Sequence, residues 1–110
     1  MNTPSPEITN CLENCVLCHR VCFTMATTHC LEVGGEHVAP NHLRLMLLCA
    51  EICQTSAKFL MAGAPLHVEI CRACATVCRE CAEDCSRLEG MDECVAACRE
   101  CAQTCERMAA

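Results

Sequence analysis

The chain has 110 residues, of which 16 are Cys, two are Phe and none is Trp or Tyr. This length predicts a single domain, residues 1–110, with a modest core. The formal net charge of −6 argues against nucleic acid as a partner. Four Gly and four Pro are too few for the loop-rich domains that disulfides usually hold together, so long regular elements are expected.

The first ten residues, MNTPSPEITN, contain neither the basic segment nor the apolar run of a secretory signal peptide. The longest mostly apolar run, LRLMLLCAEIC, is too short and too interrupted to cross a bilayer. These features predict a cytoplasmic protein without a membrane partner. In that compartment thiols stay reduced.

The first predicted helix spans about 6–32. Ser5, Pro6 and Glu7 match a helix N-terminus, where a capping side chain is followed by a Pro at the first position and an acid in the first turn. Gly34 and Gly35 are expected to end this helix.

Three more helices are predicted, at about 41–62, 66–89 and 92–108. The sequence contains no sustained period-two alternation and no Asn-Gly or Asp-Gly hairpin turn, so no strand is expected. Short links between consecutive helices favour antiparallel neighbours. The predicted fold is therefore all-α, an antiparallel up-down four-helix bundle.

Cysteines recur at steps of three and four residues within the predicted helices. Such steps place side chains on one helix face, which is the face that forms the seam of a bundle. We therefore expect a cysteine-lined core. Helix by helix, the seam cysteines are Cys11, Cys15, Cys18 and Cys22; Cys49 and Cys53; Cys71, Cys74, Cys78, Cys81 and Cys85; and Cys94, Cys98, Cys101 and Cys105.

The stripes continue beyond the cysteines toward one end of the bundle, where Cys30 lies just off the stripe of its helix. In an antiparallel bundle the end of the first helix lies beside the starts of the second and fourth. Thiol, imidazole and thioether groups, which are ligands of soft or borderline metals, are expected to gather at this mouth. They belong to Met25, His29, Cys30, His42, Met46 and Met91, and the predicted metal ligands among them are Cys30, His29, His42 and Met46.

Packing alone does not explain cysteines at the seam positions of three helices. A Cys side chain is smaller than Leu, so it buries less apolar area and risks voids in the core. Disulfides within one helix face are disfavoured because the Cβ vectors are poorly aligned, and bridges between helices do not suit a reducing compartment. Metal binding is the favoured interpretation.

The spacing of the thiols also discriminates between metals. Structural zinc sites and iron–sulfur clusters usually take their ligands from loops that converge on one point. A CxxC or CxxxC pair on one helix face instead suits Cu(I), a soft ion for which two or three sulfur ligands suffice. Each thiolate releases a proton as an ion arrives, so a core loaded with multiple Cu(I) ions stays near neutral.

Two other functions are alternatives to Cu(I) binding for a thiol-rich core. One is a zinc or mixed-metal thiolate buffer, and the other, less favoured, is an iron–sulfur or dithiol redox protein. An enzyme would need a distinctive group, such as a base beside a lone activated Cys. The near-uniform thiol array offers none, so we expect a binding protein and not an enzyme.

The first two predicted helices carry a second set of apolar residues outside the sulfur stripe, whereas the last two carry a charged face. We therefore expect the outer faces of the first two helices to pack against another subunit. The apolar residues are Leu12, Val16, Leu45, Leu48, Ile52 and Phe59.

Four segments together resemble the cytosolic branch of the copper storage proteins: NCLENCVLC, LLCAEIC, EICRACATVCRECAEDC and ECVAACRECAQTC. The resemblance covers essentially the whole chain. It implies a cysteine-filled four-helix bundle, high-capacity Cu(I) storage in copper homeostasis, the matching cysteines as ligands and a homotetramer. It also implies that copper enters through an open bundle end, where His42 and Met46 stand. A copper chaperone is a further partner to consider.

Overall fold

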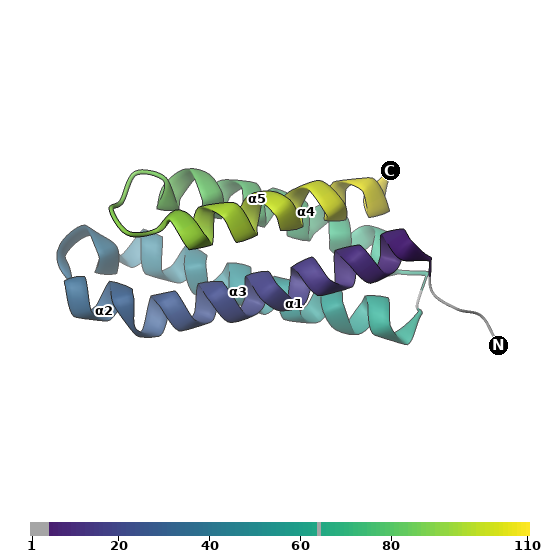
Figure 1. The fold of residues 1–110 in the computed structure, drawn as a ribbon, viewed down its shortest axis with the longest axis horizontal. Coiled ribbons are helices and arrows are strands. Elements are labelled where there is room, and N and C mark those ends of the chain that lie inside the picture. Colours follow the sequence, from purple (N-terminus) through teal and green to yellow (C-terminus); the bar gives the residue numbers. More distant parts are fainter. Residues whose placement is uncertain (1–4, 64) are drawn as a thin grey trace.

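A computed structural model describes residues 5–63 and 65–110. Four long helices form an antiparallel up-down bundle (Figure 1), which confirms the predicted all-α fold class. The elements are α1 (Pro6–Thr27), α2 (His29–Val33), the 3-10 helix η1 (Gly35–Val38), α3 (Pro40–Ala62), α4 (His67–Cys85) and α5 (Asp92–Ala109).

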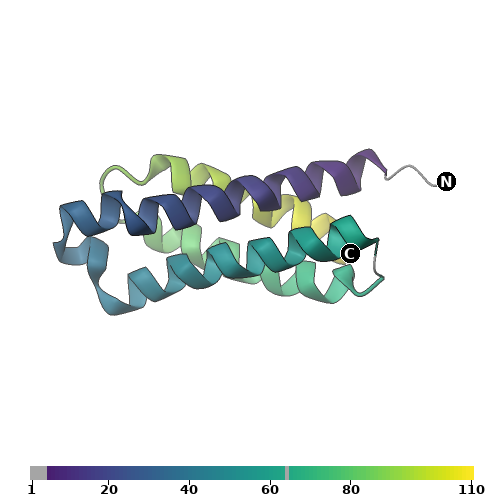
Figure 2. The ribbon, with the colours of Figure 1, turned by 90° about the horizontal axis from the view of Figure 1, so that it is seen from below.

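Each long helix packs against two of the others. Helix α1 packs against α3 and α5, and α4 packs against the same two helices. Figure 2 shows that α2, the start of α3 and the turn between α4 and α5 lie at the same end of the bundle. The seam faces of all four helices therefore enclose one core along the bundle axis.

Sequence signals set several of the helix ends. The Ser5 hydroxyl accepts a hydrogen bond from the backbone N–H of Ile8 at 3.2 Å, and Pro6 follows at the first helical position. Pro40 begins α3. Gly63 ends the same helix in the left-handed region, with φ 67°.

The predicted helix 6–32 is divided at Thr28, whose φ of −121° and ψ of −82° are not helical. Two threonine hydroxyls donate to carbonyl oxygens of the preceding turn: Thr27 to Phe23 at 2.8 Å and Thr28 to Thr24 at 2.6 Å. Hydrogen bonds of this kind bend helices. They account for the break that separates α1 from α2.

The break changes which residues continue the sulfur stripe of α1. The sequence pattern extended the stripe from Cys22 through Met25 and His29, but the structure extends it through Ala26 and Cys30 in steps of four. Ala26 and Cys30 are fully buried, whereas Met25 and His29 are half-buried. Cys30 is thus a core residue, contrary to its predicted position off the stripe.

The predicted helix 66–89 ends early, at Cys85. The turn that follows is tightened by hydrogen bonds to carbonyls three residues back, from Arg87 N to Asp84 O at 3.2 Å and from Leu88 N to Cys85 O at 3.1 Å. This turn carries the chain to the start of α5 at the mouth end.

Helix α3 is the one described helix that is long and apolar enough to cross a membrane, with a mean hydropathy of 1.4 over an 18-residue window. The apolar run LRLMLLCAEIC ends at Cys53 and is only part of this 23-residue helix. Core helices of soluble proteins pass the same test, and α3 packs here between α1 and α4.

Candidate metal centre

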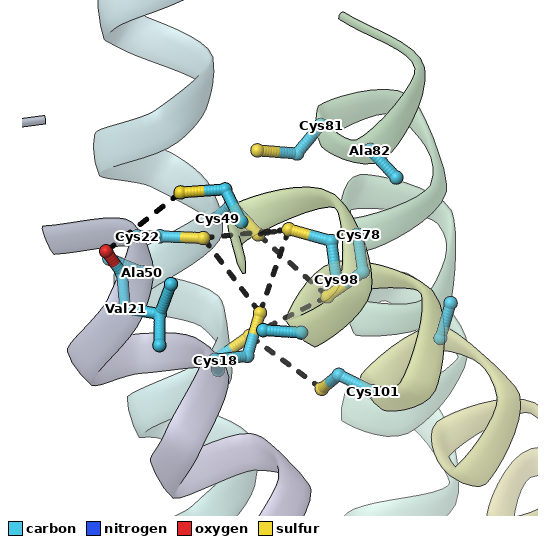
Figure 3. Close-up of a cluster of buried hydrophobic side chains, with 14 of the residues drawn as sticks. Cys18, Val21, Cys22, Cys49, Ala50, Cys78, Cys81, Ala82, Cys98 and Cys101 are labelled. Atoms are coloured by element: carbon cyan, nitrogen blue, oxygen red, sulfur yellow. Dashed lines mark hydrogen bonds between the residues drawn. The ribbon is translucent and has the colours of Figure 1, made fainter. Parts of the chain in front are cut away.

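The core of the bundle is lined by sulfur. All 16 cysteines are free thiols, and each is fully buried, with 0% of its surface exposed. They come from the four long helices and from α2. Figure 3 shows one part of this core, where the sulfur atoms of Cys18, Cys22, Cys49, Cys78 and Cys98 lie close together between the helices. The predicted cysteine-lined core is therefore confirmed.

Neighbouring sulfur atoms from different helices lie 3.5 to 3.9 Å apart, for example 3.5 Å between Cys22 and Cys98 and 3.9 Å between Cys49 and Cys98. A disulfide would require about 2.05 Å. A metal ion with bonds of about 2.3 Å to sulfur separates two of its ligands by about 3.8 Å in a tetrahedral site and about 4.0 Å in a planar three-coordinate site. The sulfur spacing therefore suits shared metal ligation.

Five groups of three or four cysteines have all their sulfur atoms within 4.8 Å of one another. The groups overlap, because seven cysteines each belong to two of them: Cys18, Cys49, Cys53, Cys74, Cys78, Cys101 and Cys105. They form a chain of sites along the core and not a single site. The groups are Cys11–Cys71–Cys105, Cys15–Cys74–Cys101–Cys105, Cys53–Cys74–Cys78–Cys101, Cys18–Cys49–Cys53–Cys78 and Cys18–Cys22–Cys49–Cys98.

Hydrogen bonds within the array shift the pKa of individual thiols in opposite directions. The hydrogen bond with Cys101 raises the pKa of the Cys53 thiol, and burial raises it further. The hydrogen bonds with Cys18 and Cys22 instead lower the pKa of Cys49. A thiolate is stabilised where its neighbours donate S–H bonds to it, so the neighbours keep their protons. Bare thiolates buried away from water would be costly, so in the metal-free protein most of these thiols keep their protons.

A different set of ligand atoms meets at the mouth. The sulfur of Cys30 lies 3.6 Å from His42 Nε2, 3.7 Å from Met46 Sδ and 3.9 Å from Met91 Sδ. All four side chains are buried, and the most exposed, His42, is 2% exposed. We call this set the mouth quartet. Of the six groups expected to gather here, the structure brings these four together.

Asp84 orients the imidazole of His42. The ring donates a hydrogen bond from Nδ1 to Oδ2 of Asp84 at 2.5 Å, which leaves Nε2 facing Cys30. Burial raises the pKa of the Asp84 carboxyl, but hydrogen bonds from Arg87 and His42 outweigh burial and hold the pKa below its ordinary value. Asp84 was missed by the sequence analysis because it lies beside the seam of α4 and not on it.

The other histidines of the mouth end make different contacts. His29 Nε2 lies 3.4 Å from the carbonyl oxygen of Glu89, and His37 Nε2 lies 2.9 Å from the same atom. His29 is thus beside the mouth quartet and not in contact with Cys30 in the described hydrogen bonds. His37 is buried, although its position in a predicted loop gave no sign of this.

The comparisons with known proteins agree with this architecture. The family model described as copper storage protein matches residues 5–110. A crystal structure of a protein from Nitrosospira multiformis is 48% identical with a TM-score of 0.93, and the alignment covers 94% of each chain.

Two solved copper storage proteins are also similar. The Cu(I)-bound copper storage protein BsCsp3 is 33% identical, with a TM-score of 0.86 and coverage of 94% of this chain and 99% of that chain. Apo copper storage protein 3 from Bacillus subtilis is 34% identical, with a TM-score of 0.81 and coverage of 93% and 98%. The search of curated proteins found no match. The chain belongs to the copper storage protein family.

Proposed function

We propose that the protein stores Cu(I), holding multiple ions per chain on cysteine thiolates in the core of the bundle. The observation that carries this proposal is the overlap of the five sulfur groups, because a sulfur shared by two groups can bridge two ions. Membership of the copper storage protein family supports it. The role is binding and not catalysis.

The charge of a loaded core favours a monovalent ion. Zn(II) held by four thiolates leaves a net charge of about −2 at each site, and several such sites would place uncompensated charge far from water. Cu(I) bound at one thiolate per ion leaves no net charge, because each ion replaces one thiol proton. The buried core therefore accepts many Cu(I) ions more readily than many Zn(II) ions.

The proposed ligands are the sixteen cysteines together with His42 and Met46 at the mouth. His42 presents Nε2, and Met46 presents Sδ, to the thiol of Cys30. His29 remains a ligand predicted from the sequence alone, because in the described structure its ring lies against the Glu89 carbonyl.

The proposed compartment is the cytoplasm, where a copper chaperone would be a suitable donor. The thiols of Cys53 and Cys78 lie 3.5 Å apart, and an oxidising compartment would favour disulfides between neighbours of this kind. A reducing compartment keeps such an array available for metal.

The proposed assembly is a homotetramer built through α1 and α3. These two helices pack side by side and expose large apolar side chains: Val16 is 48% exposed, Phe23 50% and Leu48 62%. Leu48→Glu should dissociate the assembly, whereas Ala73→Glu on the exposed face of α4 should not. Sedimentation analysis that finds a monomeric wild-type protein would contradict the proposal.

Anaerobic titration of the reduced protein with Cu(I), in competition with a colorimetric Cu(I) chelator, tests storage. We expect many ions per chain to bind before the chelator takes up copper. A parallel Zn(II) titration against a zinc chelator is the control, and it should saturate with far fewer ions. Saturation at one or two Cu(I) per chain, or a higher capacity for Zn(II), would overturn the proposal.

A further inference from the structure

Residues 28–39, which contain α2 and η1, cover the mouth end of the bundle, and we call them the cap. Two histidine rings of the cap contact the turn between α4 and α5 at the same atom, the carbonyl oxygen of Glu89. The ring N–H groups of His37 and His29 approach this oxygen to 2.9 and 3.4 Å. A carbonyl oxygen has two lone pairs and can accept both hydrogen bonds.

The mouth quartet joins the same parts of the chain. Cys30 belongs to the cap, His42 and Met46 belong to α3, and Met91 is the residue that precedes α5. The cap, α3 and the α4–α5 turn therefore each contribute ligand atoms to one point. If the cap moved away from the bundle, Cys30 would leave the other three side chains.

The separations of Cys30 from the other three ligand atoms match those around one ion. A tetrahedral ion separates two sulfur ligands by about 3.8 Å, and a sulfur from a nitrogen ligand by about 3.5 Å. The three separations measured from Cys30 are 3.7 and 3.9 Å to the two thioethers and 3.6 Å to the imidazole nitrogen. Cys30 therefore already lies at a ligand-to-ligand distance from each of the other three side chains.

The composition of the quartet favours a soft monovalent ion. One thiolate cancels the charge of one Cu(I), while the imidazole and the two thioethers are neutral ligands. A divalent ion would leave a positive charge at a site whose four side chains are buried. The carboxylate of Asp84 already accepts hydrogen bonds from His42 and Arg87.

We propose that the mouth quartet binds a single Cu(I) ion, and that this ion fastens the cap to α3 and to the α4–α5 turn. The proposal rests on the proposed storage of Cu(I) and adds a structural role for one ion. An ion that is ligated by three elements binds the closed cap more tightly than the open cap, so it shifts the cap toward the closed state. Ions deeper in the core make no such connection.

Hydrogen exchange measured by mass spectrometry tests whether Cu(I) fastens the cap. It is measured on the whole protein with and without Cu(I), under anaerobic conditions. We expect loading to slow exchange in the cap by about tenfold or more. In Met91→Leu, which conserves volume and removes one thioether, the cap should lose most of this protection. Exchange in α3 and α4 should still slow on loading.

Met108→Leu is the matched control, because Met108 is half-buried on α5 at the opposite end of the bundle. Its cap should be protected by copper as in the wild type. If copper protects the cap equally well in Met91→Leu and in Cys30→Ser, the mouth quartet does not fasten the cap. The proposed storage of Cu(I) would be unaffected by that result. Absence of copper-dependent protection from α3 and α4 as well as the cap would instead overturn the proposed storage.

Discussion

The two ends of the sulfur-lined core use different chemistry. At the far end, Cys11, Cys71 and Cys105 form an all-thiol group. At the mouth, one thiol meets an imidazole and two thioethers. Each thiol must lose a proton to bind an ion, but thioethers have no proton to lose. The all-thiol group can therefore exchange up to three protons for ions, whereas the mouth can exchange only one.

The largest expected difference between the core and the mouth concerns copper capacity. Cys53 belongs to two sulfur groups, so Cys53→Ser should lose more than one Cu(I) per chain. Cys30→Ser should lose one. Each site filled at about 100 times its dissociation constant stabilises the fold by about 2.7 kcal/mol, so the loaded Cys53 variant should also lose more stability.

Elemental analysis and anaerobic calorimetry of the loaded proteins measure both quantities. Ala57→Ser is the control, because Ala57 is buried on α3 and its substitution adds a hydroxyl without removing a sulfur. Equal losses of copper from the Cys53 and Cys30 variants would mean that the core sulfurs do not bridge ions.

Two glycines allow the backbone at the two ends of the bundle to be compared. Gly90, near the mouth, and Gly63, at the other end of α3, both have positive φ values, 78° and 67°. Ala at either position should cost about 1 kcal/mol for the left-handed backbone. A Cβ on Gly90 would also come within 2.8 Å of His29 Nε2, whereas one on Gly63 would meet no atom within 4 Å.

Gly90→Ala should therefore destabilise the metal-free protein by about 1 kcal/mol more than Gly63→Ala, in urea unfolding of the reduced protein. Adding His29→Ala to Gly90→Ala should remove the steric part of that excess. If Gly90→Ala and Gly63→Ala lower the free energy of unfolding equally, the His29 ring does not pack against Gly90 in the turn.

The sequence was sufficient to predict the bundle and its sulfur core, because steps of three and four residues determine which side chains share a helix face. It failed at the mouth, where the pattern placed His29 on the stripe and Cys30 beside it. The bend at Thr28 depends on hydroxyl-to-carbonyl hydrogen bonds, which helical periodicity does not describe. Asp84 and His37 depend on contacts between segments distant in the sequence.

Substitution of a buried serine at the far end of the core should have a smaller effect on stability. Ser56 continues the stripe of α3 beyond Cys53, is fully buried, and its hydroxyl has no hydrogen-bond partner among the described residues. Ser56→Ala should stabilise the metal-free protein by up to about 1 kcal/mol, because an unsatisfied buried hydroxyl is removed. Urea unfolding measures the change.

Ser56→Cys extends the same test to copper. The added thiol stands where the stripe of α3 lacks a sulfur, so the variant should bind at least one more Cu(I) per chain than the wild type. Thr76→Cys, on the exposed face of α4, is the control and should add no tightly held ion. An unchanged capacity in the Ser56 variant would show that sulfur at this position does not join the array.

The smallest expected effect is the acid dependence of the metal-free protein. The folded pKa of Asp84 is below its unfolded value of about 3.9. Its stabilising contribution is therefore complete above about pH 4 and is lost as the pH falls through the folded pKa. The difference in unfolding free energy between the wild type and Asp84→Asn should be constant at neutral pH and shrink below about pH 4.

Glu69 provides the matched control near the other end of α4. It pairs with Arg72 at 2.8 Å, but both side chains are more than half exposed, at 69% and 56%. Exposed pairs contribute little to stability, so Glu69→Gln should change the acid dependence much less than Asp84→Asn. Urea unfolding of the reduced proteins across the acid range measures both. Equal acid dependence in the two variants would mean that the hydrogen bonds from His42 and Arg87 stabilise the Asp84 carboxylate no more than an exposed ion pair does. Packing alone would then orient the His42 ring at the mouth.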